Sequence, residues 1–299
     1  MELRHVRYFL AIAQERSFTR AAEYLGIAQP PLSQQMKVME REIGTSLFRR
    51  LSHGVELTPA GYAFRQAVSD IPTRLNEGIR LARRAAAGES GVLRIGVTGT
   101  TALNPVVPAC IRAYKSKFPS VDLMVTEANS VALSEAVLED RLDVAILRPS
   151  GPDPDTLRKE VLSEEPLMVA LATSHRLADA ASIDLLELAT DPFILTPREV
   201  GTSLHDAVVE ACQGAGFTPL LGPAAPHIAS ILSLVSADLG VSLVPRSISQ
   251  VQMQGTLLRP LTTVTPVRIA VAYRKGSTSP TVRNFLSVTR NFSMPRSDP

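Results

Sequence analysis

The stretch SFTRAAEYLGIAQPPLSQQ, residues 17–35, restricts the fold of this chain more than any other part of the sequence. Ser17 is a favoured N-cap and Gly26 is a favoured helix end, so a short helix is expected between them. Pro30 and Pro31 fit the first turn of a second helix, where the missing N–H group has no intrahelical partner. Two short helices joined by a tight glycine-containing turn are typical of a helix-turn-helix, whose second helix enters the major groove of DNA. From this stretch alone, a helical hairpin used only for packing remains the alternative.

The helix that starts near Gln29 presents a polar face that core packing does not explain. Apolar residues three and four positions apart predict this helix to about Ile43, and the same spacing predicts an earlier helix from about Leu3 to Gln14. Glutamine pairs bidentately with adenine, serine donates or accepts a hydrogen bond, and a proline ring packs against a thymine methyl group. The residues expected to contact DNA from this helix are Gln29, Pro30, Pro31, Ser33, Gln34 and Lys37.

The next segment, LFRRLSHGVELTPAG at residues 47–61, alternates in polarity around Ser52-His53-Gly54. This pattern predicts a two-stranded hairpin. Arg49, Arg50 and His53 are expected to contact phosphates or the minor groove from it. The hairpin would therefore act as a wing beside the helix-turn-helix.

A long helix is expected after the hairpin, from Thr58-Pro59 to about Ala87. Threonine followed by proline is a favoured helix start, and Pro72, inside the pattern, is expected to kink the helix. No second helix follows closely enough to cover its apolar seam, so the expected partner is the same helix of a second subunit, in a homodimer. The seam consists of Phe64, Val68, Ile71, Leu75, Ile79, Ala82 and Ala86.

Beyond the short linker AAAGESG, residues 85–91, strand-like and helix-like patterns alternate. This alternation predicts an α/β arrangement with mainly parallel sheets, and some 200 residues exceed one small sheet. Two subdomains are therefore expected, with chain crossings at Pro149 to Pro154 and at Thr265-Pro266. The expected strands are Leu93–Val97, Leu123–Thr126, Val144–Leu147, Leu167–Leu171, Phe193–Leu195, Val241–Val244 and Ile269–Ala272.

With these patterns in place, the sequence resembles the LysR-type transcriptional regulators along essentially its whole length. The similarity lies most specifically in SFTRAAEYLGIAQPPLSQQMKVMEREIGTSLFRR and the following LTPAG. These segments combine the helix spacing, the Gln29-Pro30 helix start, Leu47-Phe48 and the Leu57-Thr58 wing exit in the family's order. MELRHVRYF and AQPPLS resemble the branch that controls degradation of aromatic compounds.

The resemblance implies an N-terminal all-α winged helix-turn-helix, a long dimerising linker helix and a C-terminal α/β module. That module would comprise two Rossmann-like subdomains, as in a periplasmic binding protein. It also implies a homotetramer, double-stranded promoter DNA and RNA polymerase as partners, and an aromatic acid or a muconate-like dicarboxylate as effector. The expected boundaries are 1–58 for DNA binding, 59–90 for the linker and 91–299 for the regulatory domain, with subdomain I at about 91–162 and 267–299 and subdomain II at about 163–266.

Two wing residues depart from the family pattern. Family wings usually carry arginine where this chain has His53, and often a basic residue where it has Glu56. A neutral histidine and a carboxylate are expected to weaken phosphate attraction and flatten the salt dependence of DNA binding.

The effector site is expected where strands end and helices begin, because helix N-termini present N–H groups to an anion there. Hydroxyl-bearing junctions follow the first two strands and precede a helix of the other subdomain. By similarity, Thr100 and Ser130 match positions that hold carboxylate effectors in aromatic-pathway regulators. Each hydroxyl has the alternative role of a simple N-cap, Arg148 that of a surface ion pair, and His227 that of a loop residue. The effector-contacting residues expected are Thr100, Thr101, Ser130, Arg148, Thr202, Ser203 and His227.

Charge and motif content bear on other classes of function. Residues 1–90 carry 13 Lys/Arg and 9 Asp/Glu, a net charge of +4 that leaves −2 for the rest of this +2 chain. A basic head suits DNA, although a solvated helical surface has the same composition. Nucleotide-binding, zinc-protease and nucleophile-elbow motifs are missing, and Cys110 and Cys212 lack redox or metal-ligand spacing, so no enzyme, metal or cofactor is expected. The N-terminus does not resemble a signal peptide, which argues against a transport solute-binding protein and for a cytoplasmic protein.

Overall fold

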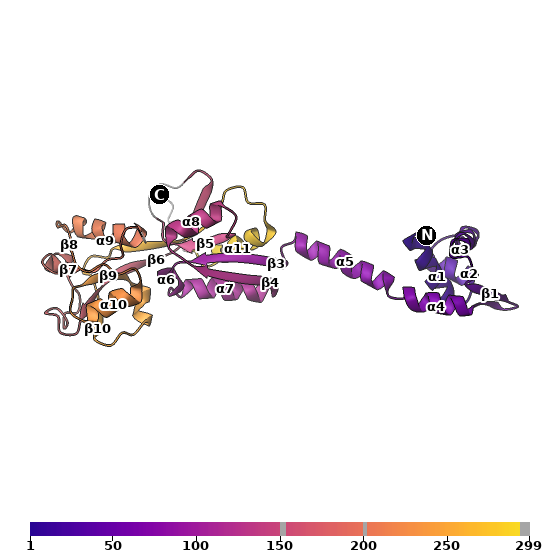
Figure 1. Cartoon of the computed structure of the whole chain (residues 1–299), viewed down its shortest axis with the longest axis horizontal. Coiled ribbons are helices and arrows are strands. Elements are labelled where there is room, and N and C mark those ends of the chain that lie inside the picture. The colour runs from indigo at the N-terminus through magenta and orange to yellow at the C-terminus, as the bar shows by residue number, and fades with distance from the viewer. Residues whose placement is uncertain (150–153, 200–201, 294–299) are drawn as a thin grey trace. The chain divides into compact units, whose positions relative to one another are not determined.

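The chain forms two compact units, residues 1–83 and 84–299. The computed structural model describes residues 1–149, 154–199 and 202–293, and Figure 1 labels its helices and strands. Each unit is described by itself below. Of the predicted chain crossing at Pro149 to Pro154, residues 150–153 lie outside the described residues.

The first unit is built on three helices, α1 (Leu3–Glu15), α2 (Phe18–Leu25) and α3 (Gln29–Ile43). The predicted caps are present. The Ser17 hydroxyl accepts a hydrogen bond from the Arg20 N–H at 3.4 Å, and Gly26 ends α2 with a φ of 68°, which favours glycine. Pro30 and Pro31 lie in the first turn of α3. The predicted helix-turn-helix is therefore confirmed.

A small aromatic and aliphatic core holds these helices to the wing. The wing consists of β1 (Phe48–Leu51) and β2 (Gly54–Leu57), which pair antiparallel around Ser52-His53. Phe9 of α1 is fully buried, and its ring centroid lies 5.2 Å from that of Phe48 and 5.0 Å from that of Phe64. The sequence prediction of a hairpin in this segment is also correct.

The predicted long helix is wrong in one respect, because it is two helices. They are α4 (Pro59–Val68) and α5 (Ile71–Ala86), separated at Ser69 and Asp70. Pro72 has no N–H group for a helical bond, and its ring clashes with the carbonyl four residues earlier, at Val68. The helix is therefore interrupted at Ser69 and Asp70 instead of being kinked. No residue of α5 is buried within one chain, and Leu75, Ile79 and Leu81 are exposed.

The second unit is organised around one mixed sheet in the order β10-β6-β11-β5-β3-β4, with β9 also paired to β6. The predicted α/β architecture is confirmed, but the expectation of mainly parallel sheets is wrong. Among the described strands only β3–β4, β3–β5 and β7–β8 pair parallel, since β6, β9, β10 and β11 all pair antiparallel. The strands are β3 (Ser90–Val97), β4 (Ser120–Glu127), β5 (Val144–Leu147), β6 (Leu157–Ala172), β7 (Pro192–Phe193), β8 (Leu220–Leu221), β9 (Ser242–Pro245), β10 (Thr256–Pro260) and β11 (Pro266–Arg274).

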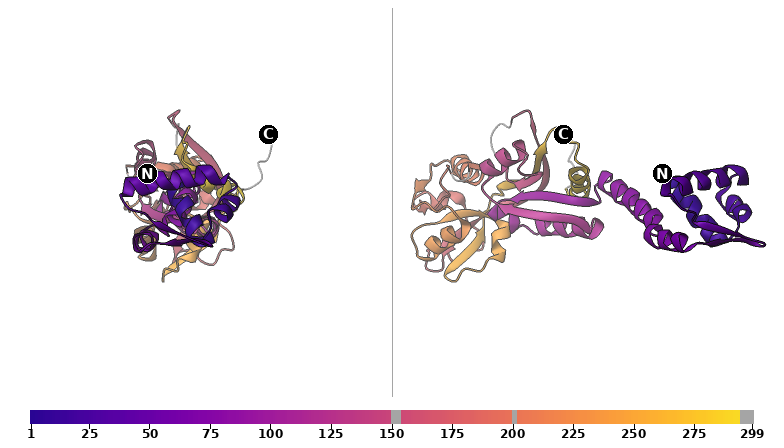
Figure 2. Two further views of the ribbon diagram at one scale, coloured as in Figure 1. Left: turned by 90° about the vertical axis from the view of Figure 1, so that its right-hand side faces the viewer. Right: turned by 45° about the vertical axis from the view of Figure 1, so that its right-hand side comes forward.

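The 16-residue strand β6 divides this unit into two lobes (Figures 1 and 2). Its first part pairs with β11, and its second part pairs with β9 and β10. The chain crosses between the lobes within β6 and again at Thr265-Pro266, where the Thr265 carbonyl accepts a hydrogen bond from the Leu167 N–H at 2.9 Å. The predicted strand Leu167–Leu171 is thus only the second part of β6.

Helices cover both faces of each lobe. In the first lobe α7 and α11 bury Tyr114 and Phe285 against one face of the sheet, and α8 buries Leu133 against the other. In the second lobe α9 packs on the β6 residues Leu167, Val169 and Leu171, whereas α10 packs beside Ala170. The helices are α6 (Gly99–Ala102), α7 (Val106–Lys117), α8 (Ser130–Leu138), α9 (Thr202–Gly214), α10 (Ile228–Ser236) and α11 (Pro280–Arg290), with 3₁₀ turns η1 (Leu185–Leu188) and η2 (Arg246–Gln250).

Gly61 gives a direct test of packing in the first unit. A β-carbon there would overlap the Leu47 carbonyl oxygen, which is backbone and cannot swing aside. We expect Gly61→Ala to lower the free energy of unfolding of this unit by about 2 kcal/mol, despite alanine's better helix propensity. Gly78→Ala in α5 is the control, because no atom lies within 4 Å of its added carbon. Calorimetry of both variants checks this: equal midpoints would contradict it.

Candidate functional site

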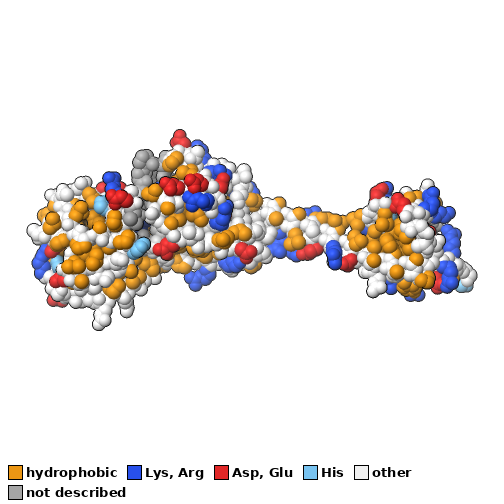
Figure 3. Space-filling model, viewed as in Figure 1, with side chains coloured by type: hydrophobic (Ala, Val, Ile, Leu, Met, Phe, Trp, Pro, Cys, Tyr) orange, Lys and Arg blue, Asp and Glu red, His pale blue; other side chains and the backbone are white. Residues whose placement is uncertain are grey.

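The polar face of α3 carries the residues predicted to contact DNA. Pro30, Pro31, Gln34 and Lys37 are exposed, whereas Gln29 and Ser33 are half-buried. The Gln29 side-chain amide donates a hydrogen bond to the Ser33 hydroxyl at 2.7 Å, so these two side chains are already ordered relative to each other. On the face seen in Figure 3, Lys and Arg side chains gather at the end of this unit that carries α3 and the wing. The surface therefore combines positive charge with ordered amide and hydroxyl groups.

The wing arginines have partners within the protein. Arg49 and Glu56 face each other across the hairpin, and the Arg49 Nε donates to the Glu56 carboxylate at 2.7 Å. The Arg50 guanidinium lies 6.0 Å from the centroid of the Phe18 ring, and His53 is exposed in the turn. Glu56 thus offsets part of the positive charge that Arg49 would bring to a phosphate.

In the regulatory unit the ends of three neighbouring strands bring together several residues predicted to bind an effector. Strands β4, β3 and β5 are adjacent and parallel, so their carboxyl ends meet at one edge of the sheet. Ser130 begins the helix after β4, Thr100 lies in α6 after β3, and Arg148 follows β5. We call this edge the strand-end site. The Arg148 Nε lies 3.4 Å from the Thr100 hydroxyl oxygen.

Arg148 is the dominant group of the strand-end site. It is 3% exposed, so the predicted alternative of a surface ion pair does not describe it. Its Nη2 donates to the Glu165 carboxylate at 2.7 Å, while its Nη1 is buried and makes no hydrogen bond within the described protein. Burial lowers the pKa of Arg148, and the hydrogen bond and charge of Glu165 act in the opposite direction. A buried N–H donor of this kind is costly unless an acceptor meets it.

Glu165 extends the ion pair into the second lobe. This carboxylate, on β6, accepts hydrogen bonds from the Ser247 N–H at 2.7 Å and from the Ser247 hydroxyl at 3.1 Å. Ser247 lies in η2, directly after β9. A chain of hydrogen bonds, buried from Arg148 to Ser247, therefore runs from the half-buried Thr100 through Arg148 and Glu165 to Ser247.

The remaining predicted effector residues differ in what they offer. Thr101 is fully buried, and its hydroxyl accepts a hydrogen bond from the Thr98 N–H and donates one to the Ile146 carbonyl, so it holds α6, which carries Thr100. Ser130 is buried at the start of α8, where Asn129 supplies the N-cap bond to the Ala132 N–H.

The other three predicted residues lie in the second lobe. Thr202 and Ser203 form the first turn of α9, not a loop before it, and His227 is an exposed residue at the N-terminus of α10. Helix α9 contacts α8, the helix that Ser130 begins, and among the described residues no side-chain hydrogen bond of His227 to the strand-end site is present.

Sequence reasoning missed Glu165, Ser247 and Glu127. Glu165 is spaced by two from the apolar residues Leu167 and Val169, so it lies on the same face of the strand as they do. This spacing was the sequence signal for a carboxylate on a buried strand face. Ser247 carried no local signal, being 82 residues from Glu165. Glu127 ends β4, and its carboxylate reaches close enough to Gly99 that a β-carbon there would lie 2.8 Å away. The strand-end site therefore carries negative as well as positive charge.

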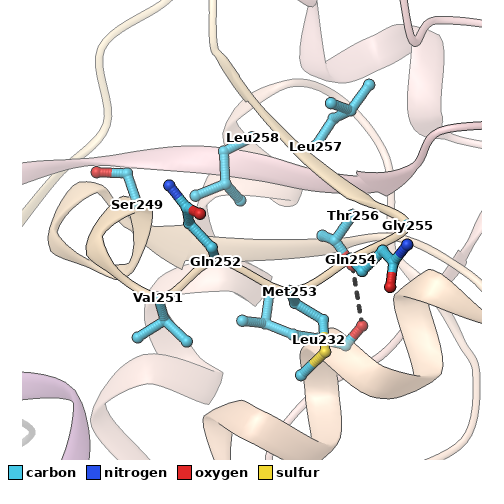
Figure 4. A pocket seen from close by; sticks show the side chains of 10 residues that line it. All are labelled: Leu232, Ser249, Val251, Gln252, Met253, Gln254, Gly255, Thr256, Leu257 and Leu258. Atoms are coloured by element: carbon cyan, nitrogen blue, oxygen red, sulfur yellow. Dashed lines mark hydrogen bonds between the residues drawn. The ribbon is translucent and has the colours of Figure 1, made fainter.

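A cavity of about 600 Å³ lies elsewhere, in the second lobe (Figure 4). Amide, hydroxyl and apolar groups line it, and the Thr256 hydroxyl donates to the Leu232 carbonyl at 3.1 Å. None of its lining side chains is charged, so it lacks a group that attracts a carboxylate. The lining residues are Leu232, Ser249, Val251, Gln252, Met253, Gln254, Gly255, Thr256, Leu257 and Leu258.

Other chemistry finds little support in the described part of the chain. No group of three or more His, Cys, Asp or Glu residues there could hold a metal ion. Burial raises the pKa of Cys110 to about 12 and that of Cys212 to about 11, so both thiols stay protonated near neutral pH. Every described helix is too short or too polar to cross a bilayer.

A winged helix-turn-helix joined to a two-lobed α/β unit defines a DNA-binding transcriptional regulator. The model of the bacterial regulatory helix-turn-helix protein, lysR family, matches residues 3–62, and that of the LysR substrate binding domain matches residues 86–293. The chain therefore belongs to the LysR family, which confirms the resemblance seen in the sequence. It is a regulator with an effector-binding domain, and the families and relatives are not enzymes.

Similar proteins span the whole chain. The HTH-type transcriptional regulator BudR of Raoultella terrigena is 35% identical over 96% of this chain and all of the relative. AlsR of Bacillus subtilis (strain 168) is 35% identical over 97% of this chain and 95% of the relative. The crystal structure of full-length CbnR complexed with its target DNA matches with a TM-score of 0.85 and 25% identity, over 98% of this chain and 100% of that chain.

The Arg49–Glu56 pair leads to a prediction about DNA affinity. Glu56→Gln removes a negative charge from the wing and releases Arg49 for the predicted contact with a DNA phosphate. We expect affinity for duplex DNA at low salt to rise several-fold, and the slope of log K against log salt to steepen by about 1. Glu139→Gln, which opens an exposed pair with Arg141 in the regulatory unit, is the control. Fluorescence anisotropy at several salt concentrations measures both, and an unchanged slope for Glu56→Gln would show that Arg49 does not contact phosphate.

The buried Arg148–Glu165 pair leads to a prediction about stability. Glu165→Gln leaves a buried guanidinium without its counter-charge, so the free energy of unfolding of the regulatory unit should fall by about 2 to 4 kcal/mol. Glu164→Gln is the matched control, because the neighbouring carboxylate pairs with Arg268 at an exposed position. That change should cost under about 1 kcal/mol. Urea unfolding followed by circular dichroism measures both; equal losses would mean that burial of the pair has no energetic weight.

Proposed function

We propose that the strand-end site binds a small carboxylate and that binding there changes how the regulator acts on promoter DNA. The observation that carries this proposal is the buried Arg148 Nη1, which meets no acceptor within the described protein and lies on the same guanidinium that contacts Thr100. A carboxylate oxygen is the acceptor that matches it best. Thr100 and Ser130 would bond the same ligand from the neighbouring strand ends.

The ligand's class follows from the balance of charge at this edge. Glu165 already neutralises much of Arg148, and Glu127 adds a second carboxylate, so the site suits an acid bound through directed hydrogen bonds more than a highly charged anion. Our proposed effector is an aromatic acid or a muconate-like dicarboxylate, and the singly charged aromatic acid fits this charge balance better. We also propose that Thr202, Ser203 and His227 close over the ligand from the second lobe.

The chain of bonds from Thr100 to Ser247 suggests how binding is communicated. A ligand bound to the Arg148 Nη1 would share the guanidinium charge with Glu165, which is bonded to Nη2 and in turn accepts hydrogen bonds from Ser247 of the other lobe. The relative stability of the two lobe arrangements would then depend on the ligand's differential affinity for them.

We propose that the regulator acts in the cytoplasm as a homodimer through α5 and as a tetramer of two such dimers, with RNA polymerase as a further partner. The exposed apolar residues Leu75, Ile79 and Leu81 support the dimer, because α5 buries none of its own residues within one chain. Figure 3 shows hydrophobic side chains along this helix. Gln29, Ser33 and Gln34 would read bases, with Pro30 and Pro31 against thymine methyl groups and Lys37, Arg49, Arg50 and His53 on the backbone.

Thermal unfolding of the full chain with benzoate, cis,cis-muconate, succinate and amino acids tests the effector class. A ligand present at about 100 times its dissociation constant should add about 2.7 kcal/mol to the stability of the regulatory unit. Ser130→Leu should remove this gain while leaving DNA affinity intact, because the added bulk fills the strand-end site. Gln252→Ala, in the uncharged cavity, is the control. Stabilisation that Gln252→Ala abolishes and Ser130→Leu preserves would move the effector to that cavity.

A further inference from the structure

His5 is a buried polar residue in the first turn of α1 and has no place in the functions assigned above. Its side chain is 4% exposed, and both ring nitrogens have partners. Nδ1 lies 3.1 Å from the Glu2 backbone N–H, which can only donate, so Nδ1 is the unprotonated acceptor. Nε2 therefore carries the proton. It donates to the Gln35 side-chain oxygen at 2.7 Å, and this fixes the orientation of the Gln35 amide as well.

Gln35 lies on α3, at the border between its buried and exposed faces. The buried face packs through Leu32, Met36 and Met39, which are at most 1% exposed. Such apolar contacts are not directional, and methionine side chains adapt their shape easily. These contacts therefore hold α3 against the core more firmly than they resist rotation of α3 about its own axis. The bond from His5 is directional and joins α3 to a helix 30 residues away in sequence.

A second directional tie holds the opposite flank of α3. The Glu40 carboxylate accepts hydrogen bonds from the Leu47 N–H at 2.7 Å and the Phe48 N–H at 3.2 Å, at the base of the wing. Gln35 and Glu40 are five residues apart, which is about 140° around a helix of 3.6 residues per turn. The two ties therefore lie on either side of the apolar face. A rotation of about 10° at a side-chain radius of about 5 to 6 Å moves an atom by about 1 Å, enough to break a hydrogen bond to a base.

We propose that His5 is a positioning residue for DNA recognition. Through Gln35 it sets the rotation of α3, and so the place where the ordered Gln29–Ser33 pair meets base edges. This rests on the base-reading role proposed for α3. His5 itself makes no contact with DNA in this proposal, so its loss should reduce discrimination between sequences more than affinity for duplex DNA in general.

Two amide substitutions separate the two bonds of His5. The oxygen of asparagine can take the place of Nδ1 and keep the bond from Glu2, but its side chain is too short to reach Gln35. The longer glutamine can place its NH₂ group where Nε2 lies and keep the bond to Gln35. The full chain and the variants His5→Asn and His5→Gln are used to select duplexes from a randomised pool. For each protein, the ratio of its dissociation constants for a scrambled duplex and for the wild-type-selected duplex is then measured.

We expect His5→Asn to lower this ratio roughly tenfold, with unchanged affinity for the scrambled duplex, and His5→Gln to keep it within about twofold of wild type. Gln35→Leu should lower the ratio as His5→Asn does, and the double variant no further, because both remove one bond. If the ratio of dissociation constants falls in proportion to the thermal unfolding midpoint across all variants, or if His5→Asn leaves the ratio unchanged, the positioning role of His5 alone is overturned. A wild-type chain that selects no sequence overturns the base-reading role of α3 as well.

Discussion

Burial of the Arg148 guanidinium is the constraint on which the regulatory unit depends. A charge at 3% exposure needs a counter-charge in contact, and the carboxylate comes from Glu165 on the strand that crosses between the lobes. Glu165 in turn takes both donors of Ser247 from the second lobe. The geometry of β5, β6 and η2 is therefore coupled through one buried network. A ligand bound at the Arg148 Nη1, as proposed above, would contact a network that includes residues of both lobes.

In the DNA-binding unit, hydrogen bonds between distant segments fix the direction in which a helix face points. Its helix α3 must keep a polar face in a fixed direction while its opposite face packs only through apolar side chains. Hydrogen bonds at Gln35 and Glu40 supply the missing direction. Its charged groups are less firmly paired than Arg148 is. Arg49 pairs with Glu56 at the surface, and Arg49 can contact a phosphate once this weak, exposed pair opens.

Much of the DNA-binding unit could be read from the sequence because its elements are specified locally. Ser17, Gly26 and Pro30 each fix a helix start or end by their own geometry, and the hairpin turn lies within 15 residues of contiguous pattern. The break at Ser69 exceeds the predicted kink because the Pro72 ring clashes with the Val68 carbonyl and offers no N–H group for a helical bond. The regulatory sheet was harder. Apolar runs show that strands exist, but they do not show which strands become neighbours. β6 and β11 become antiparallel neighbours only because the chain crosses between the lobes and returns.

The sequence by itself determined the family and the elements of the DNA-binding unit, because caps and periodicity are local properties. It also predicted Arg148 as a site residue from its position after a strand. Tertiary structure alone decided that Arg148 is buried, that Glu165 is its counter-charge and also accepts hydrogen bonds from Ser247, and that the Thr101 hydroxyl holds the start of α6. It alone joined His5 to Gln35. The physical reason is that hydrogen bonds and ion pairs between distant segments depend on distances of a few tenths of an ångström, which packing sets and no local pattern encodes.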